Sequence, residues 1–178
     1  MNFPILSTLI FLPLLSSFFI FLSKSQKNIN SAIYISLFSS IATFLLSLFV
    51  WYSLDSSSSD FQFLEEKSWI NDFIKFKLGV DGISILFIVL TTFITPICII
   101  SCLNSVKLRV KEFLIAILIL ETFMIGVFCS LDLVIFYLFF EAGLIPMFLI
   151  IGVWGGPKRV YSAFKFFLYT LLGSVLML

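Results

Sequence analysis

Two carboxylates lie inside long apolar runs, where ionisable side chains are rare. Glu141 follows two phenylalanines in the run 139–146 (FFEAGLIP), and Glu121 lies in the preceding run, 113–129. A charge near the middle of a bilayer costs about 2.5 kcal/mol or more, so such residues usually face protein or water and mark proton or ion pathways. The chemistry predicted here is therefore proton uptake and release. The structural alternative is a protonated glutamate that hydrogen-bonds a neighbouring helix.

The spacing of these residues predicts how deep they lie. Glu141 is ten residues into the segment 131–154, about 15 Å from its outer end at 1.5 Å per residue. Glu121 is eight residues from the inner end of the segment 113–129, about 12 Å deep, so both carboxylates are expected at similar depth on neighbouring helices. Lys165 is only four residues into the last segment, where a long side chain reaches water by snorkelling. It is a candidate relay, separated from Glu141 by about 12 Å in depth.

The residues that follow Glu141 modify its helix. Pro146 has no N–H and leaves the carbonyl of Ala142 without its helical donor, one turn from the carboxylate. Gly143 permits close approach of another helix. We therefore expect an unusual local environment for Glu141.

The composition excludes several classes of protein. Of 178 residues, 61% are hydrophobic and only 12% are charged, which is typical of a membrane protein. The formal net charge of +1 gives no excess of basic residues that could form a nucleic-acid-binding surface. The absence of histidine excludes His-based zinc, haem and nucleophile sites. Cys98 and Cys102 have an i, i+4 spacing, but they lack further ligands nearby and are interpreted as packing residues, as is Cys129.

The apolar runs predict an all-α polytopic membrane protein with six transmembrane helices. A bilayer core needs about 20 apolar residues, and such runs lie at 3–22, 29–52, 83–103, 113–129, 131–154 and from 161 onward. The sixth is expected to be incomplete, because the chain stops at Leu178 with no polar residue after the run. Three parts follow: two N-terminal helices (1–52), an outer polar loop (53–82) and four further helices (83–178).

Basic residues set the expected orientation. Seven of them fall in alternate loops and predict that these loops face inside, with the N-terminus outside: Lys24, Lys27, Lys107, Arg109, Lys111, Lys158 and Arg159. The long loop carries three basic and six acidic residues. Period-two alternation at 61–63 and 74–78 around Asn71 and Asp72 predicts a short β-hairpin on the membrane surface. An interfacial loop anchored by Trp69 is the alternative.

Several local motifs carry a family resemblance. They are LGVDGIS at 78–84, FFE at 139–141, LIPM at 144–147, GVWG at 152–155 and KFFLYTLLGS at 165–174. With these motifs the chain resembles the subunit 4 family of NADH dehydrogenase, an antiporter-like membrane subunit of respiratory complex I. The resemblance is strongest over residues 78–178.

The resemblance implies a function and site residues. Glu141 matches the family's essential glutamate of the fifth helix, which works with a lysine of the seventh helix in proton transfer. Lys165 falls where many relatives also carry lysine, and a glutamate at the position of Glu121 is common among mitochondrial relatives. Glu121, like Lys165, is a candidate relay. The implied role is proton translocation within NADH:ubiquinone oxidoreductase, with NAD, FMN, iron–sulfur clusters and ubiquinone bound by other subunits and no cofactor in this chain.

The resemblance also implies partners and a location. Family members have about fourteen helices, so the chain is expected to be part of a split or truncated subunit. Other membrane-arm subunits and, for the favoured split subunit, a second chain with the missing C-terminal helices are the expected partners. The expected location is the mitochondrial inner membrane, with the N-terminus toward the intermembrane space, and a bacterial inner membrane is the alternative. Two rival functions stay open: a component of a multi-subunit cation/proton antiporter, and a non-conducting structural piece of the membrane arm.

Overall fold

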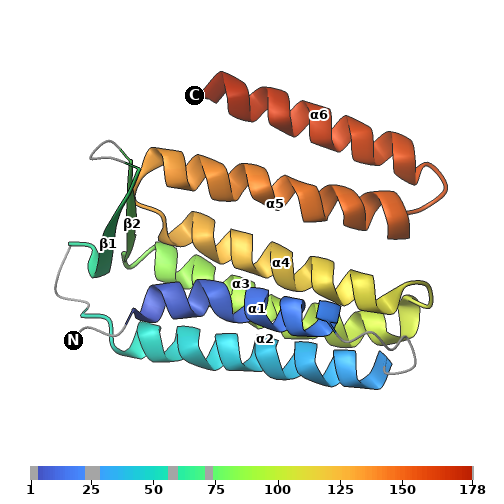
Figure 1. Cartoon of the computed structure of the whole chain (residues 1–178), viewed down its shortest axis with the longest axis horizontal. Helices are drawn as coiled ribbons and strands as arrows, with labels where there is room; N and C mark the ends of the chain where they lie inside the picture. The colour runs from blue at the N-terminus through green and yellow to red at the C-terminus, as the bar shows by residue number, and fades with distance from the viewer. Residues whose placement is uncertain (1–3, 23–28, 56–59, 71–73, 178) are drawn as a thin grey trace.

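The described residues of the chain fold into six long helices and one two-stranded sheet (Figure 1). The structure is a computed structural model that describes residues 4–22, 29–55, 60–70 and 74–177. The helices are α1 (Ile5–Leu22), α2 (Ile29–Tyr52), α3 (Ser84–Ser105), α4 (Val110–Cys129), α5 (Leu133–Trp154) and α6 (Arg159–Met177). All six are long and apolar enough to cross a bilayer. The chain is a multipass membrane protein, as its sequence predicts.

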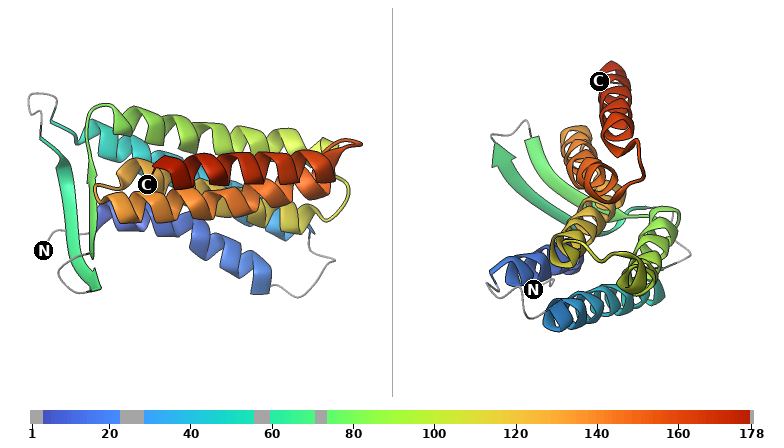
Figure 2. Two further views of the ribbon diagram at one scale, coloured as in Figure 1. Left: turned by 90° about the horizontal axis from the view of Figure 1, so that it is seen from above. Right: turned by 90° about the vertical axis from the view of Figure 1, so that its right-hand side faces the viewer.

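The helices lie side by side, with α4 near the centre of the bundle (Figures 1 and 2). Helix α4 packs against α1, α2, α3 and α5, whereas α6 packs on α5 at the periphery. Large apolar side chains of α6 are exposed, among them Leu168, Leu172 and Leu176. In a bilayer such a face contacts lipid or another helix without a solvation penalty.

The predicted hairpin is confirmed, and it lies across one end of the bundle (Figure 2). Strand β1 (Gln62–Ile70) pairs antiparallel with β2 (Ile74–Val80), in a register that sets Glu65 opposite Leu78. The pairing is irregular between Gln62 and Glu65, where Phe63 has a φ of 53°. The turn at Asn71 and Asp72, and the side chain of Trp69, lie outside the described residues.

Contacts from two sides attach the hairpin to the helices. The Glu65 carboxylate accepts hydrogen bonds from the backbone N–H groups of Leu6, at 2.8 Å, and Ser7, and from the Ser7 hydroxyl. These amides belong to the first turn of α1, which has no helical acceptors for them. On the other side, Leu131 N donates to the carbonyl of Lys77 at 3.0 Å. The outer loop is therefore a cap on the bundle.

The two helices that carry the carboxylates begin at different residues from those predicted. Residues before α5 pair with β2, so the helix starts only at Leu133, where Asp132 Oδ1 accepts from the N–H of Val134 at 2.9 Å. Asp132 is therefore a helix cap, as its boundary position suggests. Helix α4 begins three residues earlier than expected, at Val110. The later start of α5 reduces the depth of Glu141, as described below.

Helices α4 and α5 approach closely at a glycine. An added Cβ on Gly126 would lie 2.6 Å from Cδ1 of Phe139 and within 2.8 Å of two further ring atoms. The ring of Phe139 therefore fits at this position only because residue 126 has no side chain. At the opposite end of α5, the indole N–H of Trp154 donates to the carbonyl of Leu108 at 2.8 Å. These two contacts fix α5, which carries Glu141, against the α3–α4 part of the bundle.

Candidate functional site

Glu141 lies in the middle of α5 and faces α6. It comes eight residues after Leu133, the first residue of the helix, which places it about 12 Å from the outer end. This is shallower than the predicted 15 Å, because α5 starts two residues later. The carboxyl is partly buried, and its Oε2 accepts a hydrogen bond from the hydroxyl of Ser174 at 3.0 Å. Ser174 is 5% exposed and belongs to α6.

The Ser174 hydroxyl has two acceptors for one hydrogen atom. Its Oγ lies 3.0 Å from Glu141 Oε2 and 2.9 Å from the carbonyl oxygen of Leu171. A hydroxyl donates one hydrogen bond and accepts others, so it serves both forms of a carboxyl group. It donates to the carboxylate, and it accepts from the protonated acid while donating to Leu171. This arrangement suits a group that gains and loses a proton.

The structure does not bring Lys165 and Glu141 together. The lysine is six residues after Arg159, about 9 Å from the inner end of α6, whereas Glu141 is thirteen residues before Trp154, about 20 Å from the same end of α5. The Lys165 side chain is exposed, and among the described residues it makes no hydrogen bond or ion pair to Glu141. The predicted separation of about 12 Å in depth is close to this difference of about 11 Å.

Ser174 was not among the predicted site residues. It lies fifteen residues after Arg159, about 22 Å along α6, and therefore at the level of Glu141. Counting residues from the inner turn along two antiparallel helices would have found it. A serine in an apolar run is common, however, because its hydroxyl satisfies its own helix carbonyl. The signal is the shared depth, not the residue type.

The local features that follow Glu141 are present. Pro146 is buried inside the helix, and α5 continues through it to Trp154. A Cβ on Gly143 would lie 3.6 Å from the Cβ of Phe123 in α4, so the glycine lies in close contact with that helix. Gly143 thus brings the α5 segment that carries Glu141 into van der Waals contact with α4.

Glu121 faces the other side of α4. Its side chain is 2% exposed, and its Oε1 accepts from the hydroxyl of Thr43 in α2 at 2.9 Å. Cys129 ends α4 eight residues after Glu121, so the two carboxyls lie at the same distance, about 12 Å, from the outer ends of their helices. The prediction of similar depth therefore agrees with the structure. The two groups nevertheless hydrogen-bond in different interfaces, α2–α4 and α5–α6.

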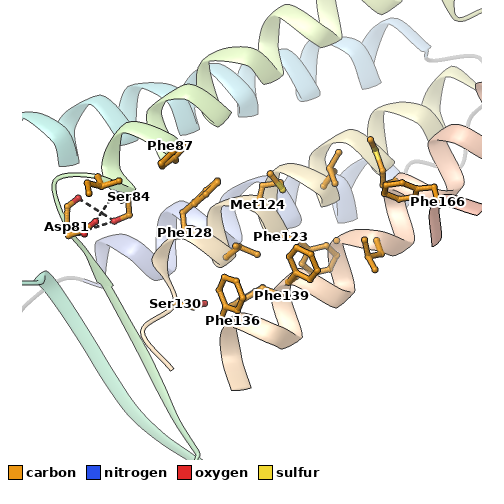
Figure 3. Close-up of a pocket in the computed structure, with 17 residues that line it drawn as sticks. Asp81, Ser84, Phe87, Phe123, Met124, Phe128, Ser130, Phe136, Phe139 and Phe166 are labelled. Carbon is orange, nitrogen blue, oxygen red and sulfur yellow. Dashed lines mark hydrogen bonds between the residues drawn. The ribbon is translucent and has the colours of Figure 1, made fainter. Parts of the chain in front are cut away.

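An apolar groove of about 790 Å³ runs between α3, α4 and α5 (Figure 3). Its polar lining is gathered at the outer end, where Figure 3 shows Asp81 hydrogen-bonded to Ser84. Aromatic rings such as Phe123, Phe136 and Phe139 line much of the remainder. Among the described residues that line this groove, the polar side chains are those of Asp81, Ser84 and Ser130.

The remaining candidates have structural explanations. Asp81 accepts a hydrogen bond from Ser84 N at 2.7 Å, and Ser84 Oγ accepts from Asp81 N at 2.9 Å, a reciprocal arrangement at the start of α3. Hydrogen bonds from the side chain and backbone of Ser84 hold the pKa of Asp81 below its ordinary value of 3.8. Cys98, Cys102 and Cys129 are free thiols. Within the described part of the chain, no group of three or more metal-ligating side chains is present.

Comparison with known proteins finds a family match and similar membrane subunits. Residues 130–178 match the family described as NADH:quinone oxidoreductase/Mrp antiporter, TM, and this stretch contains Glu141 and Ser174. NADH-quinone oxidoreductase subunit M of Rickettsia conorii is 49% identical over 98% of this chain and 36% of its own length. NADH-ubiquinone oxidoreductase chain 4 of Marchantia polymorpha is 50% identical over 97% of this chain and 35% of its own.

A solved structure agrees in fold. A chain of respiratory complex I from Thermus thermophilus with bound NADH matches 95% of this chain and 33% of its own length, with a TM-score of 0.78 and 24% identity. The chain spans about a third of the length of the curated relatives it matches. Over nearly all of its length, the chain is similar to part of subunit M and chain 4 of NADH:quinone oxidoreductase, and its residues 130–178 match the antiporter-like family model.

Proposed function

We propose that the chain is part of a proton-translocating membrane-arm subunit of NADH:quinone oxidoreductase, with Glu141 as a proton carrier. The observation that carries this proposal is the carboxyl group of Glu141, which lies about 12 Å inside the span and shares its hydroxyl partner, Ser174, with a backbone carbonyl. A carboxyl at that depth is functional by default. The named relatives support the assignment to this complex.

Lys165 has a secondary role in this proposal. It is exposed on α6 and lies about 11 Å from the depth of Glu141, so it serves as a relay through water and not as an ion-pair partner. The chain itself performs no redox chemistry in this account. NADH oxidation, quinone reduction and their cofactors belong to other subunits, and the membrane chain moves protons in response.

The proposal includes partners. Helix α6 exposes large apolar side chains along its length and packs on α5. We expect other membrane-arm subunits, and the helices that make up the rest of the relatives' length, to lie against such faces. A second polypeptide that supplies those helices is the specific form of this proposal. Mass spectrometry of the purified complex tests it, because peptides of those helices must then come from a separate chain.

The location is likewise proposed as the mitochondrial inner membrane, with the hairpin toward the intermembrane space and the α3–α4 and α5–α6 turns toward the matrix. The plant and bacterial relatives allow either this membrane or a bacterial inner membrane. Basic residues at one end of the bundle, including Lys107 and Lys158, support the orientation. Cysteine labelling of intact mitoplasts at position 60 and position 107 tests it: a membrane-impermeant maleimide should reach only position 60.

The decisive test of the function is purification through this chain in mild detergent, followed by reconstitution into liposomes. NADH:quinone reduction that acidifies the vesicle interior, with complex I subunits in the preparation, supports the proposal. The family description also names Mrp antiporters. Sodium-dependent proton exchange in a preparation without NADH-linked electron transfer would assign the chain to that class instead. Intact assembly without any proton movement would indicate a structural role.

A further inference from the structure

The face of α2 that packs against the bundle is polar. The buried residues of this helix include Ser36, Ser40, Thr43 and Ser47, whereas large apolar side chains such as Phe38 are exposed. Small hydroxyl residues allow helices in a membrane to pack closely. Most of these hydroxyls also donate to carbonyls of their own helix. Packing therefore explains the hydroxyl stripe without any further function.

Packing does not explain Glu121. Its side chain is 2% exposed, and its Oε2 is buried without a hydrogen-bond partner among the described residues. The three helices α1, α2 and α3 contain no Asp, Glu, Lys or Arg, and Glu141 is the one charged residue of α5. No cation on these neighbours can neutralise a carboxylate at position 121. A lone buried carboxylate is too costly to persist, so the resting form is the neutral acid.

Thr43 gives this acid a partner for both of its forms. Thr43 Oγ1 lies 2.9 Å from Glu121 Oε1 and 2.9 Å from the carbonyl of Ser40. The neutral acid donates to the Thr43 hydroxyl, which then donates to Ser40. On deprotonation the carboxyl O–H bond breaks and the proton passes to a water molecule, where it forms a new O–H bond. Both electrons of the broken bond stay on the carboxylate, and Thr43 turns to donate to Oε1.

The same arrangement holds at Glu141. There too a hydroxyl from a neighbouring helix lies within 3.0 Å of both the carboxyl oxygen and a carbonyl of its own helix, three residues earlier. Both carboxyls are eight residues from the outer ends of their helices. The two pairs lie in different interfaces: Glu121 of α4 contacts Thr43 of α2, whereas Glu141 of α5 contacts Ser174 of α6.

We propose that Glu121 and Thr43 form a second reversible proton-binding site, in the α2–α4 interface and separate from the site at Glu141. Glu121 binds the proton, and Thr43 is a positioning residue. The site lies outside the stretch that matches the family model, 130–178. It does not serve as a relay to Glu141, since each carboxyl hydrogen-bonds away from the other. Only its contribution to pumping rests on the proposed function.

Infrared difference spectroscopy of the intact reconstituted complex tests the proposal, because the carbonyl stretch of a protonated carboxylic acid is separate from that of a carboxylate. A pH-step difference spectrum of the wild type should contain a protonated-carboxyl band that Glu121→Gln removes and Glu141→Gln leaves in place. Thr43→Val should move this band to higher frequency, and Thr43→Ser should restore it. Thr122→Val is the matched control. Thr122 is a buried neighbour of Glu121 whose hydroxyl donates to the Leu118 carbonyl, so this variant should leave the band unchanged.

Two results would overturn the proposal. One is a wild-type pH-step spectrum whose protonated-carboxyl bands all survive Glu121→Gln. The other is a Glu121 band that appears in absolute spectra and does not change with pH, which would make the residue a permanently neutral structural acid. If Glu121→Gln does not assemble, Thr43→Val decides instead, since an unmoved band contradicts the pairing. Loss of pumping in Glu141→Gln with a titrating Glu121 band would support both proposals, and unchanged pumping would remove only the proposed function.

Discussion

The hydroxyl of Ser174 donates a hydrogen bond to Glu141 at 3.0 Å and so connects α6 to the carboxyl group of α5. Glu141 lies 13 residues before the end of α5, and Ser174 lies 15 residues after the start of α6. Because the two helices are antiparallel, these positions are at a similar level. Lys165, on the same helix, lies nearer the inner turn. The immediate partner of the carboxyl group is therefore a neutral hydroxyl, which donates to the carboxylate form and accepts from the protonated form.

Ser174→Ala should slow proton transfer at Glu141. The hydroxyl stabilises the carboxylate, and a hydrogen bond to a charged group contributes about 1.5 kcal/mol or more, which corresponds to about a tenfold loss in proton-coupled turnover. Ser174→Thr keeps the hydroxyl and should retain most of the activity. Thr170→Val is the control, because the Thr170 hydroxyl donates to its own helix at Phe166. Equal rates in the alanine variant and the control would contradict this role.

Gly126→Ala should destabilise the α4–α5 interface. The new methyl group would meet the ring of Phe139 at 2.6 Å, and overpacking of this kind costs about 1–3 kcal/mol. The expected result is less assembled complex on native gels and a lower temperature of half-inactivation. Gly173→Ala, where a Cβ has open space, should be close to neutral. The double variant with Phe139→Leu should recover part of the loss, and no recovery would assign the defect elsewhere.

Glu65→Leu should loosen the start of α1. The carboxylate accepts from two first-turn amides, those of Leu6 and Ser7, and loss of such a cap costs about 1 kcal/mol. Amide exchange in the peptide that covers residues 4–11 should then quicken about fivefold. Glu65→Gln keeps an acceptor and should have a smaller effect. Glu112→Gln, an exposed acid paired with Arg109 at the other end of the bundle, is the control and should leave this peptide unchanged.

Asp81→Asn should lower the stability of the fold at neutral pH, because the ionised Asp81 carboxylate stabilises it there. In acid the wild type loses the same stabilisation. The folded-state pKa of Asp81 lies below its ordinary value of 3.8 because of the Ser84 hydrogen bonds. A depressed carboxyl pKa stabilises the fold above the ordinary value, and this stabilisation disappears as pH falls through the lower one. The difference in unfolding temperature between wild type and variant should therefore be constant above pH 3.8 and shrink below it. A constant difference at all pH values would contradict this.

The sequence predicted the elements better than the contacts between them. Six apolar runs gave the helices, since length and hydropathy suffice, and period-two alternation gave the hairpin. The start of α5 was missed by two residues, because pairing of the segment before Leu133 with β2 is a tertiary effect. The capping role of Glu65 depends on residues 58 positions away and has no local signal.

For the site, the sequence likewise predicted the two carboxylates but not their hydroxyl partners. Glu121 and Glu141 stand out because a carboxylate in an apolar run is costly, and their equal depth follows from the helical rise. Ser174 and Thr43 do not stand out, since serine and threonine are frequent in these helices. The direction in which each carboxyl points depends on helix packing, which residue spacing within one helix cannot give.

The central claim is that Glu141 carries protons, and the most direct measurement is the ratio of protons pumped to NADH oxidised in liposomes containing the Glu141→Gln complex. Glutamine preserves the size of the side chain but cannot take up a proton. With assembly verified on native gels, the account predicts that pumping falls strongly while Glu141→Asp retains part of it and Glu112→Gln is unaffected. An unchanged ratio in a fully assembled Glu141→Gln complex would contradict the account.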